Sequence, residues 1–252
     1  MIPDGDLYDF LEHKAAQYQV SAFVDADPIS IPHRYTNRED REVAGFFAAT
    51  LAWGNRAAIL KSLGALMLLM DDAPYDYVMN GSHADDARLH RFVYRTFNGV
   101  DALCFVKCLG DVLTRFGTLE KAFADDANGD VHKALGLFRQ RFFAGHVPGR
   151  SAKHLADVRA GSSGKRLNMF LRWMVRPGPV DFGIWNSFES SSLYLPLDVH
   201  TGNVSRRLGL LMRKQNDWKA VDEVTQRLRT FDAADPVKYD FALFGLGVYE
   251  KF

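Results

Sequence analysis

Cysteine is scarce in this chain, which holds only Cys104 and Cys108 among its 252 residues. Two thiols cannot build the disulfide framework of a small secreted protein, and their scarcity suits a reducing cytoplasm. They stand four residues apart in an apolar helical stretch, a spacing more typical of two buried thiols than of half a metal site. The histidines also lack metal-binding spacings such as His-Glu-x-x-His. We therefore expect no metal and no cofactor.

Long apolar runs are missing as well. No stretch approaches the roughly 18 apolar residues that a membrane-spanning helix needs, and the start of the chain lacks the basic end and apolar stretch of a signal peptide. With 47% hydrophobic residues, the chain can still bury a large core. We expect a soluble cytoplasmic protein that acts as a monomer and has no membrane partner.

The chain has no excess of charge of either sign, because 31 basic residues balance 31 acidic ones. This balance counts against a nucleic-acid-binding protein. The basic residues are nevertheless concentrated between Arg139 and Arg176, where nine stand against one acid, Asp157. Phosphate binding needs a local patch rather than a basic average. This run predicts either such a patch or an ordinary solvated surface.

Strand-like alternation of polar and apolar residues is lacking, and so are internal repeats. Apolar residues instead recur at helical spacing between breaks of Gly, Pro, Asn or Asp. The pattern predicts helices near residues 4–18, 38–53, 55–70, 101–116, 129–143, 165–176, 199–211, 217–230 and 236–247. The expected fold class is therefore all-α.

Asp198 stands where one of these helices begins. Pro196 and Leu197 lead into it, and the apolar positions that follow recur at nearly helical steps. A carboxylate at this N-cap position accepts hydrogen bonds from free backbone N–H groups and lies at the positive end of the helix dipole. Asp198 is either only a helix cap or a carboxylate held ionised for chemistry.

The segment around this residue, Pro196-Leu-Asp-Val-His-Thr-Gly-Asn-Val-Ser-Arg-Arg-Leu-Gly-Leu210, resembles a family motif. It is similar to Val-Asp-Thr-His-Val-x-Arg-Val-x-x-Arg-Leu-Gly-Leu of the helix-hairpin-helix DNA glycosylases, which include endonuclease III and the oxidised-guanine glycosylases. This chain reads Asp198-Val199-His200 where many relatives read Asp-Thr-His. The resemblance implies that Asp198 is the catalytic carboxylate.

The same resemblance implies a catalytic lysine upstream, after Gly-x-Gly-x. Gly161-Ser-Ser-Gly-Lys165 supplies the first glycine and the lysine, but Ser163 replaces the second glycine and no Leu-Pro-Gly precedes it. The interval of 33 residues from Lys165 to Asp198 is closest to the archaeal oxidised-guanine branch. The dipole at a helix start and the neighbouring Arg166 both disfavour a cation at Lys165. A solvated face or a phosphate contact is the alternative role for this lysine.

Further residues are expected to contact DNA. An apolar helix of this chain ends in Trp53-Gly-Asn-Arg56. The helix-hairpin-helix glycosylases have a polar turn at the corresponding position, and its residues approach the opened duplex. The expected DNA contacts are Asn55, Arg56, Arg166, His200, Asn203 and Arg206. Trp53 and Trp218 are candidates for the base pocket, with core packing as the alternative for each.

Together these features predict one domain over residues 1–252 in two helical lobes around a cleft. The terminal segments would form one lobe, and roughly residues 55–210 would contain the other, with the hairpin-like segment 150–176. The resemblance implies a base-excision DNA glycosylase with AP lyase activity that flips a damaged base, with an oxidised base as one candidate, out of double-stranded DNA. The chain lacks the four cysteines of the cluster-bearing relatives, so no iron–sulfur cluster is expected. The alternatives are a non-catalytic DNA-binding protein on the same fold and a helical protein unrelated to DNA.

Overall fold

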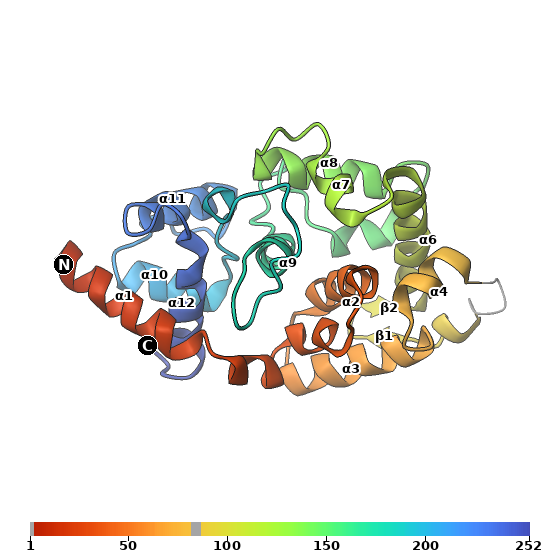
Figure 1. Cartoon of the computed structure of the whole chain (residues 1–252), viewed down its shortest axis with the longest axis horizontal. Helices are drawn as coiled ribbons and strands as arrows, with labels where there is room; N and C mark the ends of the chain where they lie inside the picture. Colours follow the sequence, from red (N-terminus) through yellow and green to blue (C-terminus); the bar gives the residue numbers. More distant parts are fainter. Residues whose placement is uncertain (1–2, 82–86) are drawn as a thin grey trace. The chain divides into compact units, whose positions relative to one another are not determined.

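The computed structural model describes residues 3–81 and 87–252 and consists mainly of helices (Figure 1). The α-helices are α1 (Asp4–Tyr18), α2 (Arg38–Leu51), α3 (Arg56–Leu69), α4 (Pro74–Asn80), α6 (Gly99–Phe116), α7 (Leu119–Ala124), α8 (Val131–Phe142), α9 (Lys165–Val175), α10 (Val199–Arg207), α11 (Trp218–Arg229) and α12 (Tyr239–Val248). Short 3-10 turns are η1 (Ser21–Ala26), η2 (Pro28–Ser30), η3 (Pro32–Arg34), η4 (Gly149–His154), η5 (Ser190–Ser192) and η6 (Pro236–Lys238). The predicted all-α fold class is confirmed.

Strand structure in the described residues is limited to one small hairpin. Its strands are β1 (Val93–Tyr94) and β2 (Phe97–Asn98), which pair antiparallel with Val93 opposite Asn98. Asn98 then caps α6 through a capping box with Asp101. Within the described ranges, no helix combines the length and the apolar character that crossing a bilayer requires.

The chain divides into two compact units. The terminal unit contains Met1–Phe23 and Asp157–Phe252, and the central unit contains Val24–Ala156. The sequence instead predicts that the segment 150–176 belongs to the lobe that contains roughly residues 55–210. In the structure, the chain from Asp157 onward belongs to the same unit as the N-terminal segment. Within this unit, α1 packs along α12, and α12 packs against α10.

Aromatic side chains fill the core of the central unit. Phe46 of α2 lies 5.6 Å from Phe138 and 5.5 Å from Phe142 of α8, measured between ring centroids. Phe105 of α6 meets Phe142 edge-on at 5.0 Å. Tilted and edge-on ring pairs of this kind add to the free energy gained from burial. They hold α2, α6 and α8 together, and thereby position the turn that follows α2.

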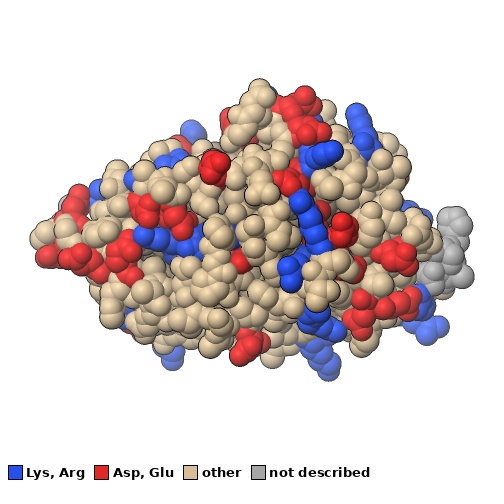
Figure 2. All heavy atoms as spheres, in the orientation of Figure 1, with Lys and Arg blue, Asp and Glu red and all other residues tan. Residues whose placement is uncertain are grey.

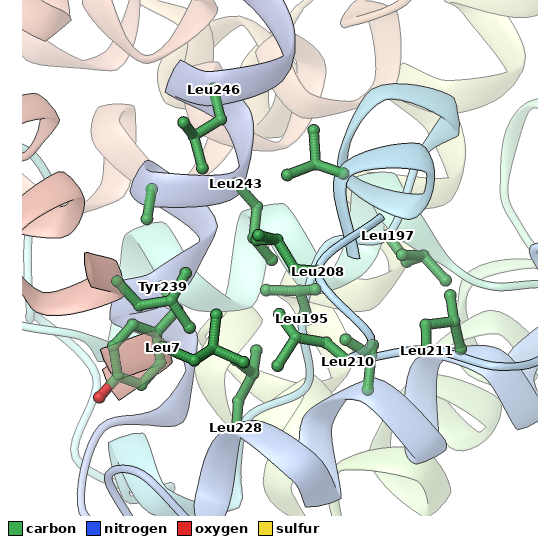
Figure 3. Close-up of a cluster of buried hydrophobic side chains, with 14 of the residues drawn as sticks. Leu7, Leu195, Leu197, Leu208, Leu210, Leu211, Leu228, Tyr239, Leu243 and Leu246 are labelled. Carbon is green, nitrogen blue, oxygen red and sulfur yellow. The ribbon is translucent and has the colours of Figure 1, made fainter. Parts of the chain in front are cut away.

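The core of the terminal unit joins α1, α10, α11 and α12 with the segment that leads into α10 (Figure 3). Leu195 and Leu197, on either side of Pro196, are buried and belong to this cluster together with Leu243 and Leu246 of α12. Burying one leucine side chain contributes roughly 1.5–3 kcal/mol. Because Asp198 comes directly after Leu197, this burial fixes the position at which its carboxylate leaves the core.

Helices α10 and α12 approach each other closely at Gly247. A Cβ atom added there would lie 3.2 Å from the Cβ atom of His200 and 3.2 Å from Cγ2 of Val204. These separations are shorter than ordinary van der Waals contacts, so a side chain at position 247 would require α10 to shift by a few tenths of an ångström. The small residue thus lets α12 support the first turns of α10.

Candidate active site

Asp198 is the N-cap of α10, as the sequence predicts. Its Oδ1 atom accepts hydrogen bonds from the backbone N–H groups of His200 at 2.8 Å and Thr201 at 3.0 Å. The Thr201 hydroxyl in turn accepts a bond from the Asp198 N–H at 2.9 Å, which completes a capping box. One carboxylate oxygen is therefore held by the helix end, and this fixes the direction of the other oxygen, Oδ2.

The main chain of Asp198 is braced from a second side. Asn216 donates from Nδ2 to the Asp198 carbonyl at 3.0 Å, and Asn216 itself accepts a bond from Arg206 at 2.6 Å. Arg206 also donates from Nε to the Arg213 carbonyl at 2.7 Å. Gly202 leaves room for this arrangement, since an added Cβ would lie 2.8 Å from Oδ1 of Asn216. The cap is thus rigid in both its side chain and its backbone.

Lys165 is the first residue of α9. The helix follows Gly164, which adopts a left-handed conformation with φ of 60° and provides no side-chain cap. The loop before it is tied to the start of α11, because the Trp218 N–H donates to the Gly161 carbonyl at 3.0 Å and Ser162 forms a β-bridge with Asp217. This tie fixes where the lysine side chain starts.

The structure brings Lys165 and Asp198 together. Nζ of Lys165 lies 3.4 Å from Oδ2 of Asp198, the oxygen that the cap leaves available. The two side chains are 27% and 22% exposed, so the pair is sheltered but reachable. An amine beside a fixed carboxylate can act as a nucleophile whose proton the carboxylate accepts or holds.

A buried ion-pair network lies in the same unit as this pair. It consists of Arg172 and Arg176 on α9 together with Asp181, Asp235 and Asp240. Arg172 pairs with Asp240 and, at 3.2 Å, with Asp181. Arg176 pairs with Asp181 at 3.2 Å and with Asp235 at 2.7 Å. The network ties α9 to the start of α12 and to the segment after α9.

Burial changes the acidity of two carboxyl groups in this network. It raises the pKa of Asp240 to about 6, against the opposing effect of the Arg172 charge. Burial likewise raises the pKa of Asp181, which Arg172 and Arg176 act to lower. Asp240 also responds to the charges of Asp198 and Lys165. The sequence interpretation missed both aspartates, since nothing near them in the chain marks them as partners of α9.

A family model covers most of this architecture. Residues 27–249 match the family described as "Protein of unknown function (DUF2400)". The chain belongs to this family. The matched region includes Lys165, Asp198 and Asp240. No curated protein and no solved structure matches the chain.

The prediction of a basic surface patch between Arg139 and Arg176 is wrong for several of these residues. Arg172 and Arg176 are buried in the ion-pair network. Arg139 donates to the carbonyls of Ala152 and Leu155, and Arg141 pairs with an aspartate of its own unit. On the face drawn in Figure 2, basic and acidic side chains are interspersed. Several basic residues of this run therefore form ion pairs and hydrogen bonds within the protein instead of a surface patch.

The other residues of the terminal unit that the sequence predicts to contact DNA or the base differ in their exposure. His200 and Asn203 are exposed on α10, close to Asp198 in the chain. Arg166 is half-buried beside Lys165, and burial lowers the pKa of its guanidinium. Trp218 is half-buried and packs against Tyr194, with ring centroids 4.9 Å apart. The guanidinium of Arg206, described above, is bonded within the unit.

The remaining predicted residues lie in the central unit. Asn55 caps α3 by accepting a bond from the Ala58 N–H at 3.2 Å, and Arg56 is half-buried at the first position of that helix. Trp53 lies under the guanidinium of Arg95, 4.8 Å from its ring centroid. Its indole Nε1 is buried and has no hydrogen-bond partner among the described residues.

The two cysteines occupy one side of α6. Their sulfur atoms lie 4.0 Å apart, with Cys108 buried and Cys104 half-buried. Burial raises the pKa of the Cys108 thiol far above its ordinary value. Over residues 3–81 and 87–252, no group of three or more His, Cys, Asp or Glu side chains is arranged to hold a metal ion.

Proposed function

We propose that this protein is a DNA base-excision glycosylase with AP lyase activity. The observation that carries the proposal is the pairing of Lys165 with the capping carboxylate of Asp198, at 3.4 Å between Nζ and Oδ2. The motif around Asp198 resembles that of the helix-hairpin-helix DNA glycosylases, and a lysine paired with this aspartate is what a lyase of that superfamily requires. The proposed substrate is double-stranded DNA that contains a damaged base.

In the proposed reaction, Lys165 supplies the nucleophile. Its neutral amine forms a bond to C1′ of the nucleotide while the bond from C1′ to the base breaks, and the base leaves with the bonding electrons and a proton. Asp198 stabilises the positive charge that grows on the sugar and accepts a proton from the amine. The C1′–O4′ bond then breaks while the nitrogen lone pair forms the C1′=N bond of a protonated Schiff base, and O4′ takes the proton that Asp198 accepted. This Schiff base loses a proton from C2′ while the C3′–O bond breaks and the 3′ phosphate leaves, and water then frees the lysine.

The fixed geometry of Asp198 suits this role. Because Oδ1 is held by two backbone N–H groups, the carboxylate cannot rotate away when the amine moves toward the sugar. A preorganised charge stabilises a transition state more effectively than a mobile one, since no reorientation is needed during the reaction. The helix end that caps α10 would therefore also direct the carboxylate at the developing cation.

Polar and basic residues near the pair support a phosphate-binding role in the proposal. His200 and Asn203 are exposed on α10, and Arg166 follows Lys165 directly. Removing a base from a duplex requires the nucleotide to rotate out, at a cost of a few kcal/mol that a damaged or mispaired base reduces. Contacts to the flanking phosphates are a usual source of the binding energy that offsets this cost.

Borohydride trapping tests the proposal. The full chain is incubated with duplexes that carry oxidised guanine, uracil, an alkylated base or an abasic site, and the reductant converts a Schiff base into a permanent adduct. We expect an adduct that Lys165→Ala abolishes and that Lys219→Ala retains. Lys219 is a matched control because it is an exposed lysine in the first turn of α11.

Other outcomes separate the alternatives. Base release without an adduct would leave a glycosylase in which water attacks and Lys165 contacts phosphate. Salt-dependent duplex binding without base release or an adduct would replace the proposal with a non-catalytic DNA-binding protein. Absence of duplex binding at low salt would exclude DNA as the partner.

A further inference from the structure

One stretch of chain, the end of the α10–α11 loop, bonds to both sides of the Lys165–Asp198 pair. Asn216 in this loop donates from Nδ2 to the carbonyl of Asp198 at 3.0 Å. The two residues after Asn216 bond to the turn that precedes Lys165, through a β-bridge to Ser162 and a hydrogen bond of 3.0 Å to the carbonyl of Gly161. Three consecutive residues therefore hold the main chain of the carboxylate and the turn from which the amine extends.

The amide of Asn216 is oriented by Arg206. Nη2 of Arg206 donates to Oδ1 of Asn216 at 2.6 Å, while its Nε donates to the carbonyl of Arg213 at 2.7 Å. An amide accepts through oxygen and donates through nitrogen, so the bond to Oδ1 turns Nδ2 toward the Asp198 carbonyl. That carbonyl also accepts the N–H of Gly202 at 2.9 Å. Both of its acceptor positions are thus used.

Gly202 leaves the space in which this amide lies. A Cβ atom added there would lie 2.8 Å from Oδ1 of Asn216 and 3.0 Å from Nη1 of Arg206. Both atoms are at the ends of flexible side chains, so a methyl group would displace them while α10 stays intact. Alanine also favours a helix more than glycine does. The amide can therefore be moved by a substitution that does not weaken the helix.

We propose that Asn216 is a positioning residue that sets the separation between the Lys165 amine and the Asp198 carboxylate, and that Arg206 acts through it. The bond from Asn216 fixes the main chain of Asp198, and the bonds of the next two residues fix the turn before Lys165. Arg206, which the sequence predicts to contact DNA, is thereby assigned to a role within the unit. The chemical effect of this role rests on the proposed lyase function, but the separation can be measured without DNA.

Carbodiimide cross-linking of the full chain measures this separation, because the reagent joins an amine to a carboxylate where the two are in contact. Peptide mass spectrometry gives the yield of the Lys165–Asp198 link relative to that of the Lys14–Glu250 link, which comes from an ion pair of 2.7 Å in the same unit. We expect Asn216→Ala to lower this relative yield about fivefold, the factor that corresponds to the net contribution of one hydrogen bond.

Three further variants separate positioning from a general loss of stability. Gly202→Ala should also lower the relative yield, although alanine favours the helix. Arg206→Ala should lower it, and should add nothing when combined with Asn216→Ala, because the arginine acts through that amide. Gln226→Ala is the matched control, since it removes another side-chain amide that donates a hydrogen bond within the same unit. It should leave the relative yield unchanged.

The same proteins are then tested by borohydride trapping on abasic-site DNA. We expect Asn216→Ala to slow adduct formation at saturating DNA and to leave DNA affinity unchanged, since the proposed role includes no phosphate contact. Arg206→Ala should likewise leave the salt dependence of duplex binding unchanged. A weaker salt dependence in Arg206→Ala would make this residue a DNA contact and overturn its assignment.

The cross-links decide the positioning role whatever the trapping shows. A relative yield in Asn216→Ala equal to that of the unaltered chain overturns the role, and so does absence of the Lys165–Asp198 link from the unaltered chain. A parallel loss of both links would also overturn it, because it would reflect a general loosening of the unit. If the relative yield falls in Asn216→Ala but the unaltered chain traps no DNA, the lyase function fails while the positioning role holds.

Discussion

Replacing Asp198 with asparagine separates its capping role from its proposed chemistry. Asparagine caps a helix about as well as aspartate, and its side-chain oxygen can still accept bonds from the His200 and Thr201 N–H groups. We therefore expect the capping contribution to the free energy of unfolding to change little. The substitution does remove the negative charge that lies 3.4 Å from the Lys165 amine.

The magnitude of the lost interaction follows from this distance. Two unit charges at 3.4 Å interact by about 1 kcal/mol in water and by about 5 kcal/mol at an effective dielectric of roughly 20. The sheltered but reachable pair falls between these limits. Loss of a positioned acid–base group lowers a rate by about a hundredfold or more. Asp198→Ala should additionally destabilise the chain by about 1 kcal/mol through loss of the cap.

The assay combines urea unfolding with single-turnover trapping on abasic-site DNA. We expect Asp198→Asn to retain stability and lose trapping, and Asp198→Ala to lose both. Asp130→Asn, at the N-cap of α8 in the central unit, is the matched control and should retain both. Trapping by Asp198→Asn at the rate of the unaltered chain would exclude a catalytic role for the carboxylate and leave Asp198 as a helix cap alone.

Three further predictions test the fold around the site. Gly247→Ala should destabilise the chain by about 1–3 kcal/mol through overpacking of α10 on α12, whereas Gly64→Ala, where an added Cβ meets nothing within 4 Å, should be neutral or stabilising in thermal unfolding. Leu195→Ala should cost about 2–5 kcal/mol in urea unfolding, and a loss below about 1 kcal/mol would contradict its place in the core. Asp240 has a raised pKa of about 6 in the folded chain against 3.8 for an ordinary aspartate carboxyl group, so the folded state holds a proton that the unfolded state has released. The free energy of unfolding should therefore fall by up to about 3 kcal/mol as pH rises from about 4 to about 6, and Asp240→Asn should lose this dependence.

Local patterns were sufficient to predict the long helices. The stripe after Lys165 predicts a helix over 165–176, and α9 spans Lys165–Val175. The Asp198 cap was likewise predicted, because it depends only on the residues that follow it. The short helices α4 and α7 and the hairpin of β1 and β2 were missed, since so few residues show no clear period.

A single sequence does not show which residues pair between distant parts of the chain. The sequence places Arg172 and Arg176 in a surface patch, yet both are buried and pair with Asp240 and Asp235, which follow them by 68 and 59 residues respectively. Whether an arginine faces solvent or a buried carboxylate depends on which helices pack together. The pairing of Lys165 with Asp198 was expected only from the resemblance, and the bracing of Asp198 by Asn216 was not foreseen.

The most direct measurement is the identity of the residue that carries DNA after borohydride reduction. Peptide mapping of the trapped protein by mass spectrometry locates the attached sugar. We expect attachment at Lys165, in the peptide that begins α9. Attachment at any other lysine, or no attachment to abasic-site or damaged-base DNA, would contradict it.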